Sequence, residues 1–208
     1  MIARPISAAL AAVALLAGCG MLPHAPEPEI DQGAWPEARD RATRFADLYD
    51  GFEHRASLWA VRLTREVREE RARRVAQWLS WTQAELDAKL AEERAEAAKW
   101  DDFVLFLYTE DRKWNDLDAP ESIWRVEYDV GGGEAVAPRA TAIGRTATFD
   151  QLFPMGGPFD TAYLLRFPLA AEGTAPLPGF LRVSSALGEM LLTYTPGSQP
   201  TPAPRKVE

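Results

Sequence analysis

The chain is poor in the side chains that many enzymes and metal centres use. Its 208 residues include one cysteine, Cys19, and two histidines, His24 and His54. A single cysteine excludes an intrachain disulfide, so the fold has to be held together by its core. One cysteine and two distant histidines do not provide the ligand spacing of a zinc site. We therefore expect neither a disulfide-stapled fold nor a zinc centre.

Common catalytic and phosphate-binding motifs are also missing. The sequence has no Gly-x-Ser-x-Gly, and no Lys-Ser/Thr pair follows the glycines at 131–133. A Ser-His-Asp triad would have to use His54, with Ser57 nearby. Carboxylate pairs such as Asp101-Asp102 could serve a hydrolase, but in a chain this acidic we interpret them as solvated strand ends. We predict a protein that is not an enzyme and has no cofactor.

The N-terminal apolar segment is too short to cross a membrane. Ile6 to Ala17 form twelve apolar or small residues, and Arg4 is the only charged residue before Glu27. A membrane-spanning helix needs roughly 20 apolar residues. A positive charge followed by roughly 7–15 apolar residues is typical of a secretory signal peptide. The segment therefore predicts export, and an uncleaved N-terminal anchor is the alternative.

The segment ends in Leu16-Ala17-Gly18-Cys19. These residues resemble the lipobox of bacterial lipoproteins, in which Leu lies three positions before the cysteine and small residues lie between. The resemblance covers residues 1–19 only. It implies a signal peptide at 1–18, cleavage between Gly18 and Cys19, and a diacylglycerol thioether on Cys19. In that family Asp after the cysteine favours the inner membrane, so Gly20 favours the outer membrane.

Acylation also explains why an exported chain would carry one unpaired cysteine. Two or three acyl chains anchor a protein stably, whereas one chain binds only marginally. The formal net charge is −8, and removal of Arg4 with the signal peptide leaves −9. An acidic protein is repelled by phosphate backbones, so we expect no nucleic-acid partner. The expected partners are the lipid bilayer, through Cys19, and other proteins of the cell envelope.

The composition predicts one folded domain between two poorly structured segments. Residues 19–36 are rich in proline and lack hydrophobic periodicity, which is typical of a flexible tether. Residues 37–195 have enough aromatic and aliphatic side chains for a single core. Residues 196–208 are again rich in proline and predict a loose tail.

Helical periodicity is clearest in the first half of the domain. Apolar spacings of three and four predict a short helix over 37–50. Residues 65–80 and 82–99 predict two helices, as a hairpin or as one bent helix, and we favour the hairpin. Thr64 is the first N-cap, and Thr82 and Glu85 form a capping box for the second helix. Residues 56–64 fit a helix or a buried strand, and we favour the strand.

Strand-like patterns follow Trp100. Short strands are predicted at 103–109, 123–128, 134–137, 141–149, 161–167, 179–185 and 189–195, separated by Gly and Pro. This punctuation is typical of antiparallel sheets. We predict an α+β fold, a β-sandwich of about seven strands with the helical hairpin at 65–99 inserted after its first strand. The alternative is a separate helical region packed on a C-terminal β domain.

Three features are candidate binding sites. Asp111, Asp116 and Asp118 cluster oxygen ligands that calcium would accept, but the EF-hand spacing is absent and we favour an ordinary connecting turn. The arginines between positions 62 and 74 could meet lipid phosphates, although interleaved glutamates favour a solvated helix face. The tryptophans could line a glycan-binding surface, and we favour the core for most of them.

The leading functional hypothesis is a membrane-anchored envelope lipoprotein that serves a structural or protein-interaction role. The second is a lipoprotein that binds a glycan or a cation, and the third is a carboxylate-dependent hydrolase. A flat closed surface would favour the first, a concave pocket with exposed tryptophan the second, and two carboxylates facing across a cleft the third.

Overall fold

The computed structural model describes residues 33–129, 136–169 and 178–195. The predicted cleavage and acylation residues, Gly18 and Cys19, lie outside this part of the chain, as does the predicted tail at 196–208. No helix in the described ranges has both the length and the apolar character needed to span a bilayer.

The fold is α+β, with four α-helices, one 3₁₀ turn and eight strands in the described residues. The helices are α1 (Trp35–Ala42), α2 (Arg65–Leu79), α3 (Gln83–Ala97) and α4 (Ala147–Leu152), and the 3₁₀ turn is η1 (Arg112–Trp114). The strands are β1 (Thr43–Asp50), β2 (Glu53–Arg62), β3 (Trp100–Thr109), β4 (Arg125–Asp129), β5 (Arg139–Ala142), β6 (Thr161–Pro168), β7 (Gly179–Ser185) and β8 (Gly188–Tyr194).

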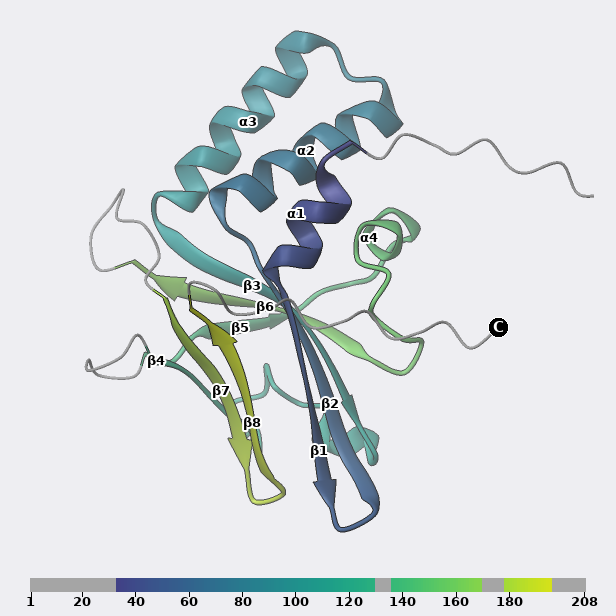
Figure 1. Ribbon diagram of the computed structural model, residues 1–208, viewed down its shortest axis with the longest axis vertical. Helices are drawn as coiled ribbons and strands as arrows, with labels where there is room; N and C mark the ends of the chain where they lie inside the picture. Colours follow the sequence, from purple (N-terminus) through teal and green to yellow (C-terminus); the bar gives the residue numbers. More distant parts are fainter. Residues whose placement is uncertain (1–32, 130–135, 170–177, 196–208) are drawn as a thin grey trace, which may run out of the picture. The chain divides into compact units, whose positions relative to one another are not determined.

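The strands form two antiparallel sheets. The larger sheet has the order β1-β2-β3-β6-β5, and the smaller has the order β4-β7-β8 (Figure 1). The prediction of one sandwich of about seven strands is therefore corrected to eight strands in sheets of five and three. The helical hairpin α2–α3 follows the second strand, not the first, because the chain makes the additional strand β1.

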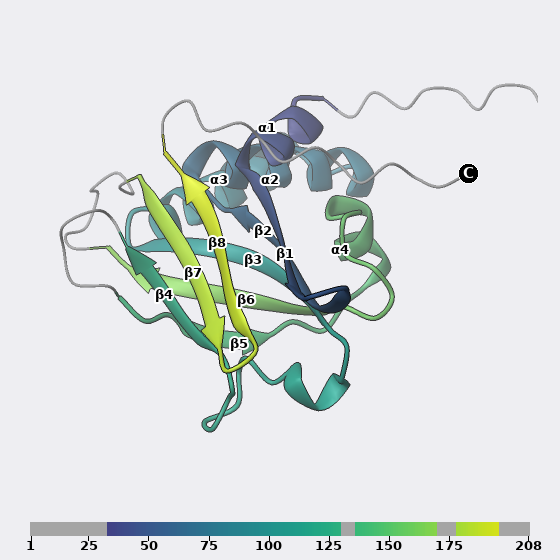
Figure 2. The same cartoon turned by 60° about the horizontal axis from the view of Figure 1, so that its bottom comes forward.

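The five-stranded sheet separates two hydrophobic clusters. Its inner face packs on β4, β7 and β8 through alternate residues such as Leu58, Leu105 and Leu165. Its outer face packs on the helices through the residues in between, such as Val61 and Phe106. Figure 2 shows the small sheet in front of the large one, with α1, α2 and α3 behind it. Burial on both faces explains why β2 and β3 are continuous apolar runs.

The prediction of a helix over 37–50 is wrong in its second half. Helix α1 begins inside the predicted tether, where Pro36 occupies the first turn and loses no hydrogen bond. The helix ends at Ala42, and residues 43–50 pair with β2 as a β-hairpin. Asp50-Gly51 is thus a hairpin turn, with Gly51 at φ 62°, because pairing with the buried strand β2 outweighs the helical spacing.

The strand predicted at 141–149 is also corrected. Strand β5 ends at Ala142, and residues 147–152 form α4. The Thr146 hydroxyl accepts a hydrogen bond from the Phe149 backbone N–H at 3.2 Å, as an N-cap does. Phe149 and Leu152, three residues apart, then face the helix-side cluster. In the predicted strand at 134–137, Val136 makes an isolated bridge to Tyr128, while 134 and 135 lie outside the described residues.

Several predictions are confirmed. Residues 53–62 form a strand, which decides the ambiguity at 56–64. The Thr64 side chain caps α2, and Thr82 and Glu85 form the capping box of α3. Helix α2 leaves Leu79 of its last turn exposed.

Gly156 provides a test of how tightly α4 and its following turn pack on the large sheet. A Cβ atom at Gly156 would lie 2.4 Å from the ring of the fully buried Phe106. We expect Gly156→Ala to lower the free energy of unfolding by about 1–3 kcal/mol, because the ring has to shift within a packed core. Gly144→Ala is the matched control, since no atom lies within 4 Å of its added Cβ. Equal stability of the two variants in urea denaturation would contradict the packing.

Candidate functional site

The acidic pair Asp101-Asp102 is buried at the start of β3, at the base of the helical hairpin. The two residues are 3% and 0% exposed, so the prediction that they are solvated strand ends is wrong. Successive residues of a strand point to opposite faces of the sheet. Asp101 accordingly lies on the face of the small sheet and Asp102 on the face of the helices, and each meets arginine there.

On the inner face, Asp101 forms a bidentate ion pair with Arg62 of β2. Arg62 Nε and Nη2 donate to the two carboxylate oxygens at 3.0 and 2.6 Å. The guanidinium also lies over the rings of Tyr128 and Tyr194, at 5.3 and 5.8 Å from their centroids. Burial raises the pKa of Asp101, against the opposing effect of Arg62, and it raises the pKa values of both tyrosines.

On the outer face, Asp102 joins three elements. It accepts hydrogen bonds from Arg68 Nη2 of α2 at 2.6 Å and from Arg166 Nη2 of β6 at 2.8 Å. Arg68 Nε also donates to the Leu63 carbonyl at 3.0 Å. Arg166 reaches Glu96 of α3 at 2.9 Å. These contacts fasten both helices of the hairpin to the sheet.

Glu93 of α3 extends this network across the hairpin. It pairs with Arg68, Arg71 and Lys89 at 3.3, 3.0 and 3.4 Å. Burial opposes ionisation of Glu93, but the three cations lower its pKa below the ordinary value. Arg68 and Arg71 of α2 therefore turn toward acidic partners, and Arg62, Arg68 and Arg74 are buried. The prediction of a solvated arginine face is wrong for these three.

His54, the histidine that a catalytic triad would need, lies in the β1–β2 hairpin. Its Nε2 atom is 3.1 Å from Asp47 Oδ1, and its ring stacks on Tyr108 with centroids 5.5 Å apart. Ser57 is the cross-strand neighbour of Asp47. No hydrogen bond joins Ser57 to His54, so the three side chains lie close together without the connections of a triad.

The candidate calcium loop is held by its own side chains. The Asp111 side chain caps η1 and pairs with Lys113 Nζ at 2.6 Å. Asp116 accepts a hydrogen bond from the Ser122 hydroxyl at 2.9 Å, and Asp118 is exposed. Across the described ranges, no three Cys, His, Asp or Glu side chains gather as a metal site would require. This arrangement is that of the connecting turn that the sequence also allowed.

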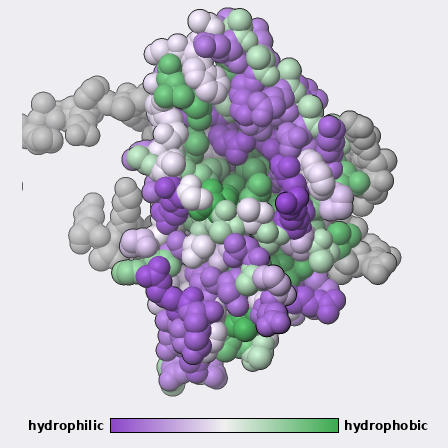
Figure 3. Space-filling model, turned by 180° about the vertical axis from the view of Figure 1, so that it is seen from behind, coloured by the Kyte–Doolittle hydropathy of each residue, from purple (hydrophilic) through white to green (hydrophobic). Residues whose placement is uncertain are grey.

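A shallow groove lies between the helical hairpin and α4. Two adjoining hollows of about 290 and 380 Å³ share Trp81 and Lys89. The floor is apolar, and Arg71, Lys89 and Glu93 lie among the lining residues. Trp81 is half-buried there, as are Trp78, Trp100 and Trp114 at other places. Only Trp35, Trp59 and Trp124 are buried in the core, so the prediction that most tryptophans belong to the core is wrong. Seen from behind, the molecule has a recess with apolar residues within a hydrophilic surround (Figure 3).

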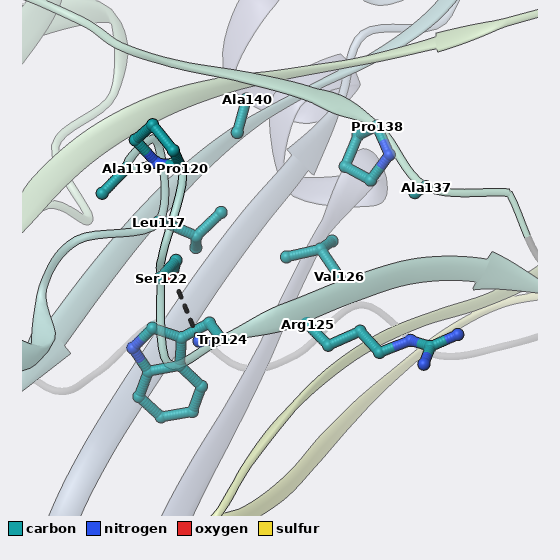
Figure 4. Close-up of a pocket in the computed structure, with 10 residues that line it drawn as sticks. All are labelled: Leu117, Ala119, Pro120, Ser122, Trp124, Arg125, Val126, Ala137, Pro138 and Ala140. Atoms are coloured by element: carbon teal, nitrogen blue, oxygen red, sulfur yellow. Dashed lines mark hydrogen bonds between the residues drawn. The ribbon is translucent and has the colours of Figure 1, made fainter.

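A second pocket, of about 280 Å³, lies between the edges of β4 and β5. Leu117 and Val126 point toward each other at its centre, while Pro138, just before β5, and Ala140 of β5 lie opposite them (Figure 4). The pairing of β4 with the residues before β5 stops at Tyr128 and Val136. Pro138 lacks an N–H to continue that ladder, which leaves the two sheets separated at this edge.

Comparison of the chain with protein-family models, curated proteins and solved structures found no match.

The contacts of Asp102 with Arg68 and Arg166 predict a large loss of stability when the Asp102 carboxylate is replaced by a neutral group. Asp102→Asn would leave the buried Arg68 and the partly buried Arg166 without their shared counter-charge. We expect it to lower the free energy of unfolding by about 3–5 kcal/mol, the usual cost of breaking a buried ion pair. Asp118→Asn is the exposed control and should change stability by no more than about 0.5 kcal/mol. If chemical denaturation gave Asp102→Asn the same small effect, the cluster would not hold the hairpin.

The ion pairs of Glu69, which join α2 to α3, predict a contribution to stability that depends on pH. The hydrogen bond from Arg94 lowers the pKa of Glu69 to about 2, with Arg65 and Arg73 acting in the same direction and burial opposing them. A carboxyl group with a lowered folded-state pKa stabilises the protein above its ordinary pKa, 4.5, and this stabilisation is lost as the pH falls toward 2.

Wild type should therefore be more stable than Glu69→Gln at pH 7, and the difference should narrow below pH 4.5. Glu92→Gln, on the exposed side of α3, is the control, since Glu92 pairs with one cation, Lys89, at 2.9 Å within the described residues. Urea denaturation at several pH values measures both variants. A difference for Glu69→Gln that stayed constant from pH 7 to pH 3 would contradict the shifted pKa.

Proposed function

We propose that the chain is a lipoprotein of the cell envelope, anchored through acylated Cys19, whose folded body binds another envelope protein. The lipobox Leu16–Cys19 carries the proposal, because it supplies both an export signal and a site for stable anchoring. Gly20 after the cysteine supports the outer membrane as the location. On this proposal the two facing sheets act as a sandwich scaffold that holds the helical hairpin.

The folded body supports a binding role in two ways. Its acidic pair Asp101-Asp102 forms ion pairs with arginines at the base of the hairpin. These charges therefore serve the fold and leave binding, not catalysis, as the role for the surface. Its described surface keeps large apolar side chains in solvent, among them Tyr49, Phe52 and Leu79. A contiguous apolar patch is a common mark of protein-binding surfaces, and Tyr49 and Phe52 belong to the same β-hairpin.

A glycan-binding lipoprotein is the second candidate. Half-buried Trp81 in the groove between the hairpin and α4 favours it, because a sugar ring can stack on an indole. Both members of the pair Asp101-Asp102 are held by arginines, which disfavours a hydrolase that would use them. An acidic chain continues to favour protein or glycan over nucleic acid as partner.

The anchor is tested by metabolic labelling. Wild type should incorporate radiolabelled palmitate and sediment with membranes, whereas Cys19→Ala should lose the label because it has no thiol to acylate. The comparison needs a control variant that leaves the lipobox intact, such as Ser57→Ala. Wild-type protein recovered without label from the soluble fraction, with its thiol open to alkylation, would overturn the anchor.

The binding role is tested on wild-type protein extracted from the envelope in mild detergent. Co-purification of a stoichiometric protein partner is the expected result. If no protein co-purified and the same material bound to a glycan array, the second candidate would replace the first.

A further inference from the structure

The turn between β1 and β2 has two residues, Gly51 and Phe52, since Asp50 pairs with Glu53. Gly51 has φ 62°, and Ser80 is the one non-glycine residue in the described ranges with positive φ. Positive φ at the first central position alone defines a type II′ turn, which needs glycine there. The turn makes no comparable demand on its second position, so the hairpin does not require an aromatic residue at 52.

Phe52 is nevertheless fully exposed, at 105% of the reference area, and Tyr49, near the end of β1, is 57% exposed. The turn lies at the end of β1 and β2 away from α1 and α2, because those helices adjoin the other ends of the two strands (Figure 1). A row of rings leads from this turn onto the sheet. Tyr49 lies 5.0 Å from His54, and His54 stacks on Tyr108 at 5.5 Å. The tip thus presents aromatic surface that its own core does not cover.

Acidic side chains surround these rings. Four carboxylates lie at this end of the hairpin, and one guanidinium, that of Arg55, bridges three of them; they belong to Asp47, Asp50, Glu53 and Glu110. These four carboxylates and Arg55 together carry a net charge of −3. Carboxylates are repelled by an anionic lipid surface, so the charge disfavours insertion of Phe52 into a bilayer. It favours a protein surface that carries lysine or arginine.

We propose that Phe52 and Tyr49 are the anchor of a docking surface, and that Phe52 enters an apolar pocket bordered by basic residues on a partner protein. The inference rests on the proposed function, since it specifies which part of the body meets the envelope partner. An aromatic side chain buried at the centre of an interface commonly supplies much of its binding energy. The acidic residues around it speed encounter with a basic partner and fix orientation.

Photocrosslinking tests where the partner sits. A benzophenone amino acid replaces Phe52 in the full-length chain, and the envelope is irradiated and examined by mass spectrometry. A matched chain carries the same group at Phe159, which is 66% exposed before β6. We expect one discrete protein adduct from position 52 that is absent from position 159. Lipid adducts alone, no adduct, or the same adduct from both positions would each overturn the proposal.

Alanine substitution tests the energetic role of the ring. Phe52→Ala should reduce recovery of the co-purifying partner at least about tenfold, as expected for a central aromatic residue, and Phe159→Ala should leave it unchanged. Asp50→Lys should also reduce recovery. The melting temperature of Phe52→Ala should match wild type, because a fully exposed side chain contributes little to stability.

The outcomes separate this inference from the proposed function. If wild type retained a partner and Phe52→Ala retained it equally, the docking surface would be wrong while the binding role stood. If wild type retained no partner, the binding role itself would fail.

Discussion

The fold depends on placing charge inside the protein at the start of β3. Asp101 and Asp102 point to opposite faces of the large sheet, and arginines from β2, α2 and β6 meet them. Buried ion pairs often add little net stability compared with apolar residues, but one partner left alone is costly. The ion pairs therefore determine position more than stability. The hairpin can pack on the sheet only where Arg68 reaches Asp102. This requirement fixes the position of α2 and α3 more narrowly than apolar packing would.

The elements with strong local signals could be predicted from the sequence. Thr64, Thr82 and Glu85 mark helix starts by side-chain hydrogen bonds to nearby backbone, which depend on a few residues only. Strand β1 could not be predicted, because residues 43–50 have helical spacing and their state is decided by pairing with β2. Helix α4 is short and depends on Thr146 as its cap. At β1, tertiary contact overrides local preference, whereas at α4 the local cap is present and was not recognised.

The charge network was missed for a related reason. Arg68 and Asp102 are separated by 34 residues in sequence, whereas sequence reasoning pairs charges three or four residues apart. Glu69 shows both levels: it pairs with Arg65 and Arg73 within α2, as the spacing allows, and with Arg94 of α3, which spacing cannot reveal. One signal was available. Two aspartates directly before a strand buried on both faces are difficult to place in solvent, and buried carboxylates require cationic partners.

Residues that the fold requires can be separated from residues that it does not require, and only the latter inform on function. Gly51 is required by the backbone of its turn, and Asp102 by the arginines around it, so neither residue informs on function. Phe52 satisfies no such requirement: its ring contacts no core and its position in a type II′ turn accepts small polar residues. An exposed aromatic residue costs solubility, and net negative charge nearby offsets that cost. Aromatic surface and acidic charge are thus concentrated where β1 meets β2, at the opposite end of these strands from the buried network that fastens the hairpin. Contact at the tip can therefore change without disturbing the ion pairs on which the fold rests.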